Sequence, residues 1–514
     1  MKAFARICLA ALALSFAGAS AASAADCAGL AKLALPGAAV TSAELVGPGA
    51  FVAPASPFPP PPGMPPASYK GLPSFCRVQV TATPAKDSDI KIEVWLPVQN
   101  WNGKFAGIGN GVWAGQIGYN AMIEPLMRGY AVAATDTGHT GSGLDATWAV
   151  GHPDRLVDFG YRAVHEMTVK AKAAVAAFYG KGPSLSLWVS CSTGGRQGLM
   201  EAYRYPADYD GISAMAPANP MTALMIQTIW TGNAALKTPQ DAVPMTKLAV
   251  VHAAYLTQCD GKDGVSDGFS SDPERCGFDP GIVQCKGADA PDCLTAAQVE
   301  TLRAVYGGVR DPRSGAPMFA GFQPGSEMQV GLLMMGPAPF PVATSYMRDV
   351  VFQDPNWDFR SFDYGKDGDT ARKAGADILD VPPDGLKAFF ARGGKLLLSH
   401  GWSDGLIPAP NTVAFYHAML ATMDAKTAGR SMRLFMLPGT CHCGGGDGPF
   451  VFDALGAIDD WASADHAPAR IVASRPPGGP ALSRPLCPYP SVARYAGTGD
   501  TNDAKSFVCV APGK

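Results

Sequence analysis

Alternating apolar and polar residues predict the first strands of this chain. After Phe75 the segment CRVQVTATPA is rich in β-favouring residues, and in DIKIEVWLPV the side chains of Ile90, Ile92, Val94 and Leu96 occupy every second position. Such alternation is the pattern of a strand with one buried face. We therefore expect two neighbouring antiparallel strands here.

Longer apolar runs predict buried parallel strands in the next part of the chain. Residues 104–115 (KFAGIGNGVWAG) read as a short strand entering a glycine-rich loop, and residues 129–138 (GYAVAATDTG) read as another strand. Apolar positions then recur at helical spacing between residues 157 and 179, and the run LSLWVSC follows. Buried strands joined by a crossover helix are typical of a parallel α/β sheet.

The regular pattern stops after a further short strand at residues 211–217. Residues 220–383 contain four cysteines, acidic loops and Met-rich helices such as 328–335, and strand patterns return at 395–400 (KLLLSH) and 431–437 (SMRLFML). This return indicates an insertion within one sheet. The predicted division is a first core segment at 25–219, a lid domain at 220–383 and a second core segment at 384–514.

The start of the chain has the pattern of an export signal. Lys2 and Arg6 precede an apolar stretch, and the small residues Ala22-Ser23-Ala24 suit cleavage before Ala25. We therefore expect a signal peptide at 1–24 and a secreted or periplasmic protein. No later apolar run reaches the roughly 18 residues that a membrane span needs.

The charge of the chain limits the classes of partner it can bind. The formal net charge is −3, and it becomes −5 when Lys2 and Arg6 leave with the signal. Both signs are dispersed, so no basic surface for nucleic acid or an anionic membrane is expected. The sequence gives no indication of oligomeric state.

The cysteine spacing predicts a disulfide framework. Twelve cysteines are present, and eleven remain after Cys8 leaves with the signal. Exported proteins use such cysteines mostly for disulfides. Spacing suggests pairing Cys27 with Cys76, Cys259 with Cys276, Cys285 with Cys293, and Cys487 with Cys509. Cys191, Cys441 and Cys443 then remain, so at least one thiol is free or pairs between chains.

A small-residue turn after LSLWVSC contains a candidate nucleophile. Ser192-Thr193-Gly194-Gly195 lies between the predicted strand and a helix-favouring stretch at 196–208. This resembles the G-x-S-x-G nucleophile elbow, although Ser190 stands where the first glycine is usual. An ordinary turn between a strand and a helix is the alternative.

Two further residues favour the elbow. Asp404 follows the predicted strand at 395–400, and His442 follows the one at 431–437, giving the order Ser, Asp, His of α/β-hydrolases. In that arrangement His442 takes the proton of Ser192, while Asp404 orients the imidazole. His139 also ends a strand, but a structural role suits it better than that of a base.

Two backbone N–H groups are candidates for an oxyanion hole. One belongs to Thr193, directly after the candidate nucleophile, and the other to the loop at 109–111. An ordinary glycine turn is the alternative. A nucleotide-binding loop is disfavoured, because no helix of the required pattern follows.

Cys191 and the two cysteines beside His442 leave several readings open. A bond from Cys191 to Cys443 would hold two loops that must meet. Cys441 is also a possible partner, and Cys191 could instead be a buried thiol. A nucleophilic role for Cys191 is less favoured, since a bridged or strand-embedded sulfur is unreactive.

An acidic loop in the predicted lid suits calcium. Asp260, Asp263 and Asp267 supply hard oxygen ligands within eight residues, and the glycines between them let the loop curl. The spacing differs from an EF-hand because no glutamate closes the loop. An acidic solvated turn is the alternative.

Seven sequence blocks together resemble the tannase and feruloyl esterase family across essentially the whole mature chain. They are NWNGKF with GIGNG, GYAVAATDTGHTG, FGYRAVHEMT, CSTGGRQGL, CDGKDGVSDG, SHGWSDGLIP and CHC, in the family's order. The resemblance implies an α/β-hydrolase core with a lid that shapes specificity. It also implies esters of aromatic acids as substrates, among them ferulate, gallate and, in one branch, a terephthalate monoester.

The resemblance also implies roles for individual residues. The family's pattern places the triad on Ser192, Asp404 and His442, and a disulfide between Cys191 and Cys443. Its structural calcium site corresponds to Asp260, Asp263 and Asp267 with backbone oxygens of Val265 and Phe269. Its oxyanion loop often has a double glycine where this chain has Gly111-Val112, and we assign that donor to Gly111.

We therefore expect a serine esterase acting on small aromatic esters. A terephthalate-monoester hydrolase or a general carboxylesterase is the alternative within hydrolases. A calcium-stabilised extracellular binding protein without catalysis is the alternative from another class, and the intact triad with its flanking cysteines argues against it. A metallohydrolase is disfavoured because the sequence lacks H-E-x-x-H.

Overall fold

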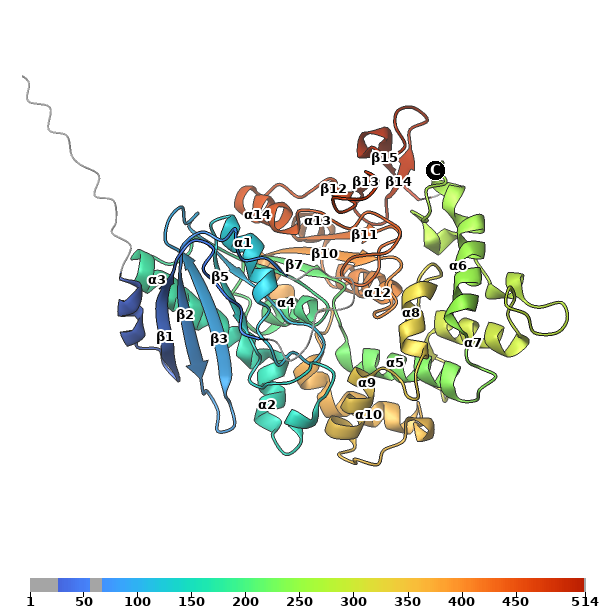
Figure 1. The fold of residues 1–514 in the computed structure, drawn as a ribbon, viewed down its shortest axis with the longest axis horizontal. Coiled ribbons are helices and arrows are strands. Elements are labelled where there is room, and N and C mark those ends of the chain that lie inside the picture. The colour runs from blue at the N-terminus through green and yellow to red at the C-terminus, as the bar shows by residue number, and fades with distance from the viewer. Residues whose placement is uncertain (1–25, 56–66, 513–514) are drawn as a thin grey trace, which may run out of the picture.

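One nine-stranded sheet organises the chain in this computed structural model, which describes residues 26–55 and 67–512 (Figure 1). The predicted signal peptide and Cys8 lie outside these residues. The strand order is β1-β2-β3-β5-β4-β6-β7-β10-β11. The bounds are β1 (Ala38–Val46), β2 (Phe75–Ala82), β3 (Ile90–Pro97), β4 (Lys104–Gly107), β5 (Ala131–Thr135), β6 (Leu185–Cys191), β7 (Gly211–Met215), β10 (Lys395–Gly401) and β11 (Met432–Leu437).

The sheet is antiparallel at one end and parallel at the other. Strands β1, β2, β3 and β5 pair antiparallel, which confirms the predicted β2–β3 pair. From β5 through β4, β6, β7 and β10 to β11, every pairing is parallel. The parallel strands β5 and β10 are buried along their whole lengths, as their continuous apolar runs predicted.

Helices cover both faces of the sheet. Helices α3 (Ala163–Tyr179) and α4 (Thr193–Arg204) contact one face, and α14 (Ala454–Ala464) covers the other. Successive side chains of β6 enter the two cores in turn: Trp188 packs with the α3 and α4 side, and Leu187 with the α14 side. Other helices of the core are α1 (Ile123–Met127), α2 (Pro153–Val157), α12 (Ala409–Leu420) and α13 (Ala425–Ser431).

The chain leaves the sheet after β7 and returns at β10, the next strand in the sheet. We call residues 216–394 the helical insertion. Most of its helices lie at the right and bottom of Figure 1, away from β1–β3. Buried residues between 235 and 334 form an apolar cluster within the insertion, and a second cluster joins the insertion to core residues such as Trp113 and Phe159. They are α5 (Met221–Leu236), α6 (Met245–Cys259), α7 (Ala296–Gly307), α8 (Glu327–Met334), α9 (Pro341–Ser345), α10 (Lys366–Leu379) and α11 (Lys387–Ala391), with short strands β8 (Val309–Arg310) and β9 (Pro317–Phe319).

Two hairpins that the sequence analysis did not predict end the fold. Strand β12 pairs with β13, and β14 pairs with β15. Their bounds are β12 (Ile471–Ser474), β13 (Ser483–Leu486), β14 (Val492–Tyr495) and β15 (Phe507–Val510). Within the described ranges, no helix is both long and apolar enough to cross a membrane.

Candidate active site

Ser192 occupies a sharp turn between β6 and α4. Its backbone has φ 65° and ψ −127°, a conformation that non-glycine residues rarely adopt. A side chain at Gly194 would place its Cβ 2.0 Å from the Ser190 Oγ atom, so the turn requires glycine there. Ser190 is therefore accommodated in place of the usual glycine because Gly194 has no side chain.

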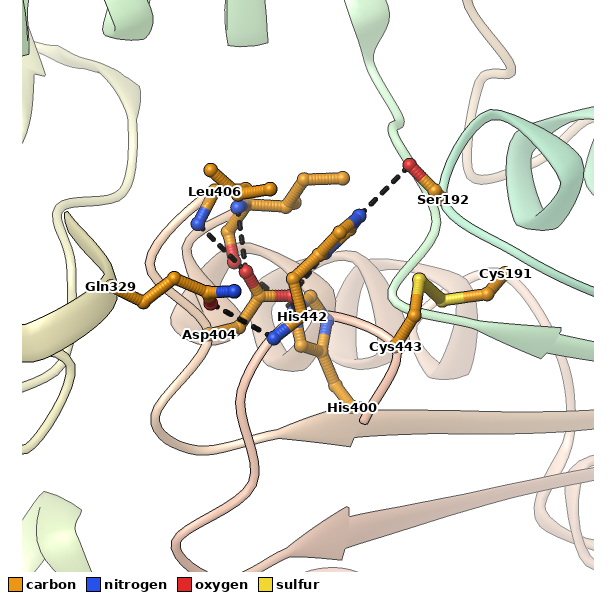
Figure 2. The surroundings of a disulfide bond; sticks show 9 residues. Cys191, Ser192, Gln329, His400, Asp404, Leu406, His442 and Cys443 are labelled. Carbon is orange, nitrogen blue, oxygen red and sulfur yellow. Dashed lines mark hydrogen bonds and ion pairs between the residues drawn. A yellow bond between two sulfur atoms is a disulfide. The ribbon is translucent and has the colours of Figure 1, made fainter. Parts of the chain in front are cut away.

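Ser192, His442 and Asp404 form one series of hydrogen bonds (Figure 2). The Ser192 Oγ atom lies 2.9 Å from His442 Nε2, and His442 Nδ1 lies 2.7 Å from Asp404 Oδ2. The three residues follow β6, β11 and β10, so the carboxyl ends of three parallel strands supply them. The residues selected from the sequence thus meet at one edge of the sheet.

Asp404 is fully buried, and both of its carboxylate oxygens accept hydrogen bonds. The N–H groups of Leu406 and Ile407 donate to Oδ1 at 2.8 and 2.9 Å. His400 Nε2 lies 3.0 Å from Oδ2, beside the bond from His442. Burial works to raise the pKa of Asp404, but the charge of His442 and the hydrogen bonds from both histidines outweigh it and lower that pKa. Asp404 is therefore held as a carboxylate.

His400 is a further partner of Asp404, which the sequence pattern did not indicate. It is fully buried at the end of β10, and its Nε2 atom also lies 3.1 Å from the carbonyl oxygen of Ile407. Both neighbours of Nε2 are acceptors, so this nitrogen carries a proton and donates. Thr412 Oγ1 lies 2.8 Å from Nδ1. The signal in the sequence was a histidine four residues before the candidate aspartate in SHGWSD.

A disulfide joins Cys191, next to Ser192, to Cys443, next to His442, with 5.9 Å between their Cα atoms (Figure 2). This crosslink connects the loops of the nucleophile and the base across 252 residues of sequence. Four more disulfides link the pairs expected from spacing: Cys27–Cys76, Cys259–Cys276, Cys285–Cys293 and Cys487–Cys509.

Cys441 is the free cysteine among the described residues. Burial, together with the charges of Asp404 and Asp447, raises the pKa of its thiol to about 12. A thiol with so high a pKa is protonated at neutral pH and is a poor nucleophile.

The glycine-rich loop after β4 lies against the start of α4. Gly194 N–H donates to the carbonyl oxygen of Asn110 at 2.7 Å, and Thr193 Oγ1 donates to that of Val112, also at 2.7 Å. Thr193 is the first residue of α4, so its N–H has no acceptor within the helix. Gly111 lies between the two loop residues that contact α4. Both predicted oxyanion donors are thus on adjoining segments beside Ser192.

An apolar pocket opens beside Ser192 and His442. The sheet side contributes Val112 and Thr193, and the helical insertion contributes much of the remaining wall. No Asp, Glu, Lys or Arg side chain is among the described residues that line it. Prominent apolar residues from the insertion are Met221, Leu224 and Met225 of α5, Leu333 of α8, and Phe340 and Val342.

The acidic loop predicted to bind calcium follows α6. Asp260 accepts backbone N–H bonds from Asp267 and Gly268 at 3.0 and 2.9 Å, and Asp263 accepts one from Val265 at 3.1 Å. These bonds curl the loop, and the side chains of Asp260 and Asp263 are buried in it.

Asp267 has an unused oxygen in this loop. Its Oδ2 atom pairs with the buried Arg484, whereas its Oδ1 atom is buried and has no partner within the described ranges. Burial raises the pKa of Asp267 to about 6, against the effect of Arg484, and the charges of Asp263 and Asp260 raise it further. One arginine thus faces three acidic groups. This donor set fits a hard divalent cation such as calcium.

His139 is buried among aromatic side chains. Its ring stacks on Trp148 with 3.8 Å between centroids, and burial lowers its pKa to about 4. This packing agrees with the structural role expected from the sequence.

The strand order, the turn at Ser192 and the Ser-His-Asp series at the strand ends define a protein of the α/β-hydrolase type. The sequence matches the family described as tannase and feruloyl esterase over residues 76–510. The chain belongs to this tannase and feruloyl esterase family, as its sequence blocks predicted, and it is a carboxylic ester hydrolase.

Relatives agree in sequence and in fold. An uncharacterized esterase from Xanthomonas campestris pv. campestris is 35% identical over 540 residues, covering 96% of this chain and 92% of that protein. The mono(2-hydroxyethyl) terephthalate hydrolase of Piscinibacter sakaiensis is 32% identical over 525 residues, covering 87% and 86%. The crystal structure of feruloyl esterase B from Aspergillus oryzae superposes with a TM-score of 0.86 at 28% identity, covering 93% of this chain and 98% of that one.

Proposed function

We propose that the protein is an exported serine esterase that hydrolyses esters of aromatic acids through Ser192, His442 and Asp404. The observation that carries this proposal is the hydrogen-bonded series from Ser192 Oγ through His442 to the buried Asp404. Membership of the family supplies the reaction class, and the series supplies the residues that would perform it.

In the proposed mechanism, His442 Nε2 takes the Ser192 proton as Oγ attacks the ester carbonyl carbon. Asp404 keeps the Nδ1 proton of His442 in place and stabilises the charged imidazole that forms. The tetrahedral intermediate collapses to an acyl-enzyme as His442 gives its proton to the leaving alcohol. Water, deprotonated by the same imidazole, then releases the aromatic acid and restores Ser192.

We assign the oxyanion hole to the N–H groups of Thr193 and Gly111. The contacts of Asn110 and Val112 with the start of α4 support this assignment, since they hold the glycine-rich loop beside Ser192. Each such donor contributes roughly 3 kcal/mol to stabilising the transition state.

The composition of the pocket favours an uncharged aromatic acyl group. Apart from the catalytic His442, none of the described residues that line the pocket beside Ser192 has an acidic or basic side chain. A second carboxylate on the acyl group would lose its hydration there without gaining an ion pair. Feruloyl or galloyl esters therefore fit this pocket better than a terephthalate monoester.

We assign residues 220–383 as a lid domain, because α5 and α8 form much of the pocket wall.

We further propose that Asp260, Asp263 and Asp267, with the carbonyl oxygens of Val265 and Phe269, hold a structural calcium ion. The buried, unpartnered oxygen of Asp267 supports this assignment.

Export from the cytoplasm is supported by the five disulfides, which form and persist in oxidising compartments.

The Ser192→Ala variant tests the assignment of the nucleophile. It should fold with an unchanged melting temperature and lose hydrolysis of methyl ferulate, methyl gallate and p-nitrophenyl acetate by at least about 10³-fold, since the covalent step is lost. The wild type should hydrolyse methyl ferulate faster than monomethyl terephthalate at equal concentration. Turnover retained by Ser192→Ala would contradict the triad, and a preference for the charged monoester would contradict the assignment of the acyl group.

A further inference from the structure

One side chain of the helical insertion contacts the backbone of both loops that carry the partners of Ser192. Gln329 lies on α8, and its Oε1 atom accepts the N–H of Gly405 at 2.8 Å and the N–H of His442 at 2.9 Å. Gly405 directly follows Asp404. Figure 2 shows the Gln329 carboxamide directed at these two loops. A single oxygen atom therefore ties the loop after β10 to the loop after β11.

The backbone of α8 also lies directly against the Asp404 loop. A Cβ atom at Gly405 would lie 2.2 Å from the backbone nitrogen of Val330 and 2.6 Å from the carbonyl carbon of Gln329. Because both atoms belong to the helix backbone, no side-chain movement could relieve the overlap. The absence of a side chain at Gly405 is what allows the helix to come within hydrogen-bonding distance of the loops.

The start of α8 is fixed within the insertion. Glu327 is fully buried, and its carboxylate accepts hydrogen bonds from the Gly325 N–H at 2.8 Å and from the Tyr306 hydroxyl of α7 at 2.6 Å. His252 of α6 lies 2.9 Å from the same carboxylate. Gln329 is two residues away, so its carboxamide projects from a helix that is held in place on several sides.

The same helix contributes to the pocket wall. Leu333 lines the pocket beside Ser192, and it lies four residues after Gln329, one turn along the same face of α8. A shift of this helix would therefore change the pocket wall and the support of the His442 backbone together.

We propose that Gln329 is a positioning residue for catalysis, through which α8 sets the relative placement of Asp404 and His442. This inference rests on the proposed roles of Ser192, His442 and Asp404. The Gln329 carboxamide does not touch the reacting atoms. It fixes two backbone N–H groups, and a base displaced by about 1 Å loses up to about 100-fold in rate.

Replacement of the Gln329 side chain separates positioning from simple packing. Gln329→Met keeps the length of the side chain and loses the acceptor, so kcat for methyl ferulate should fall by about 10- to 100-fold while KM changes less than about threefold. The rate of inactivation by diethyl p-nitrophenyl phosphate should fall in parallel, because this reagent reports the reactivity of Ser192 without an aromatic acyl group. Gln329→Glu keeps an acceptor oxygen and should recover most of kcat.

Two controls make the outcome decisive. Met328→Ala alters an exposed residue of the same helix and should leave kcat and KM unchanged. Gln329→Asn keeps the amide but is too short to reach both N–H groups, so it should behave like Gln329→Met. It serves as the test variant if Gln329→Met fails to fold.

Wild-type kcat and inactivation rate in folded Gln329→Met or Gln329→Asn would overturn the inference. Equal losses of kcat in Gln329→Glu and Gln329→Met would also overturn it. An inactive Ser192→Ala beside a fully active Gln329→Met would reject this inference alone, whereas an active Ser192→Ala would reject the proposed triad.

Discussion

Asp404 has two histidine partners, although the proposed mechanism uses only one of them. His442 faces Ser192, while His400 lies behind the carboxylate, with Nε2 shared between Asp404 Oδ2 and the carbonyl oxygen of Ile407. His400 thus connects the carboxylate to the loop that carries it. Because Asp404 is fully buried, each donor matters for its orientation and for its charged state.

We expect His400→Leu to lower kcat by about 10-fold and to reduce the free energy of unfolding by about 1–3 kcal/mol. The variant removes one donor from Asp404 and leaves the hydroxyl of Thr412 without its buried partner. KM for methyl ferulate should change little, since His400 does not line the pocket. Steady-state kinetics and thermal melting measure both effects. Thr412→Val is the matched control, and it should lower the melting temperature with a smaller effect on kcat. An unchanged kcat in His400→Leu would show that Asp404 needs no second histidine.

Residue type and chain order were sufficient to select Ser192, Asp404 and His442, because each follows an apolar run that predicts a strand. His400 and Gln329 could not be selected in the same way. His400 reads as the last residue of a buried strand, and Gln329 lies in a Met-rich helix of the insertion. His400 contacts Asp404 only four residues away, but that contact depends on the turn after the strand, whose shape the apolar pattern does not give. Gln329 contacts His442 across 113 residues of sequence, which no local pattern encodes.

At the scale of elements, strands with a simple burial pattern were predictable and others were not. The fully buried β5 and β10 are continuous apolar runs. Strand β1, with the sequence AAVTSAELV, is only partly buried and consists mostly of small or polar residues. Its sequence therefore shows neither the alternation of a strand nor the spacing of a helix. The hairpins β12–β13 and β14–β15 have four-residue strands, which are too short for a periodic signal.

The acidic loop after α6 should contribute stability that depends on calcium. A ligand that binds the folded state but not the unfolded state raises the free energy of unfolding by about 2.7 kcal/mol at a ligand concentration 100 times Kd. We therefore expect chelation by EGTA to lower the melting temperature by several degrees, and added CaCl2 to restore it. Activity at 25 °C should persist in the chelated, folded enzyme, since the loop is not part of the pocket beside Ser192.

Asp267→Asn provides the matched variant for this prediction. It removes the charge of the carboxylate whose Oδ1 atom lacks a partner, so its melting temperature should no longer respond to EGTA or CaCl2. Differential scanning calorimetry measures both responses. A wild-type melting temperature that ignores EGTA would contradict the calcium assignment. Immediate loss of turnover in a chelated sample that remains folded would instead indicate a direct role of the ion in catalysis.

At the scale of the whole molecule, His252 joins the helical insertion to the sheet side of the protein. Its Nδ1 atom lies 2.9 Å from Glu327 of α8, and its Nε2 atom lies 3.0 Å from Asp447 in the chain after β11. Burial works to lower the pKa of His252, but the hydrogen bonds and charges of Asp447 and Glu327 outweigh it and raise that pKa to about 9. The imidazolium therefore bridges two carboxylates from separate parts of the fold at neutral pH.

This bridge predicts a loss of stability at alkaline pH. The folded protein holds the His252 proton up to a pKa of about 9, whereas the unfolded chain releases it near 6.5, so the contribution is complete below pH 6.5 and is lost as pH rises through 9. We expect a contribution on the order of 2 kcal/mol, because solvent screens the pair with the half-exposed Asp447. The wild-type melting temperature should therefore fall between pH 6 and pH 9.5 by more than that of His252→Gln. Other groups that titrate in this range affect both proteins equally. The difference between the two proteins in the slope of melting temperature against pH therefore isolates His252. Equal slopes would show that the insertion and the chain after β11 stay joined without this proton.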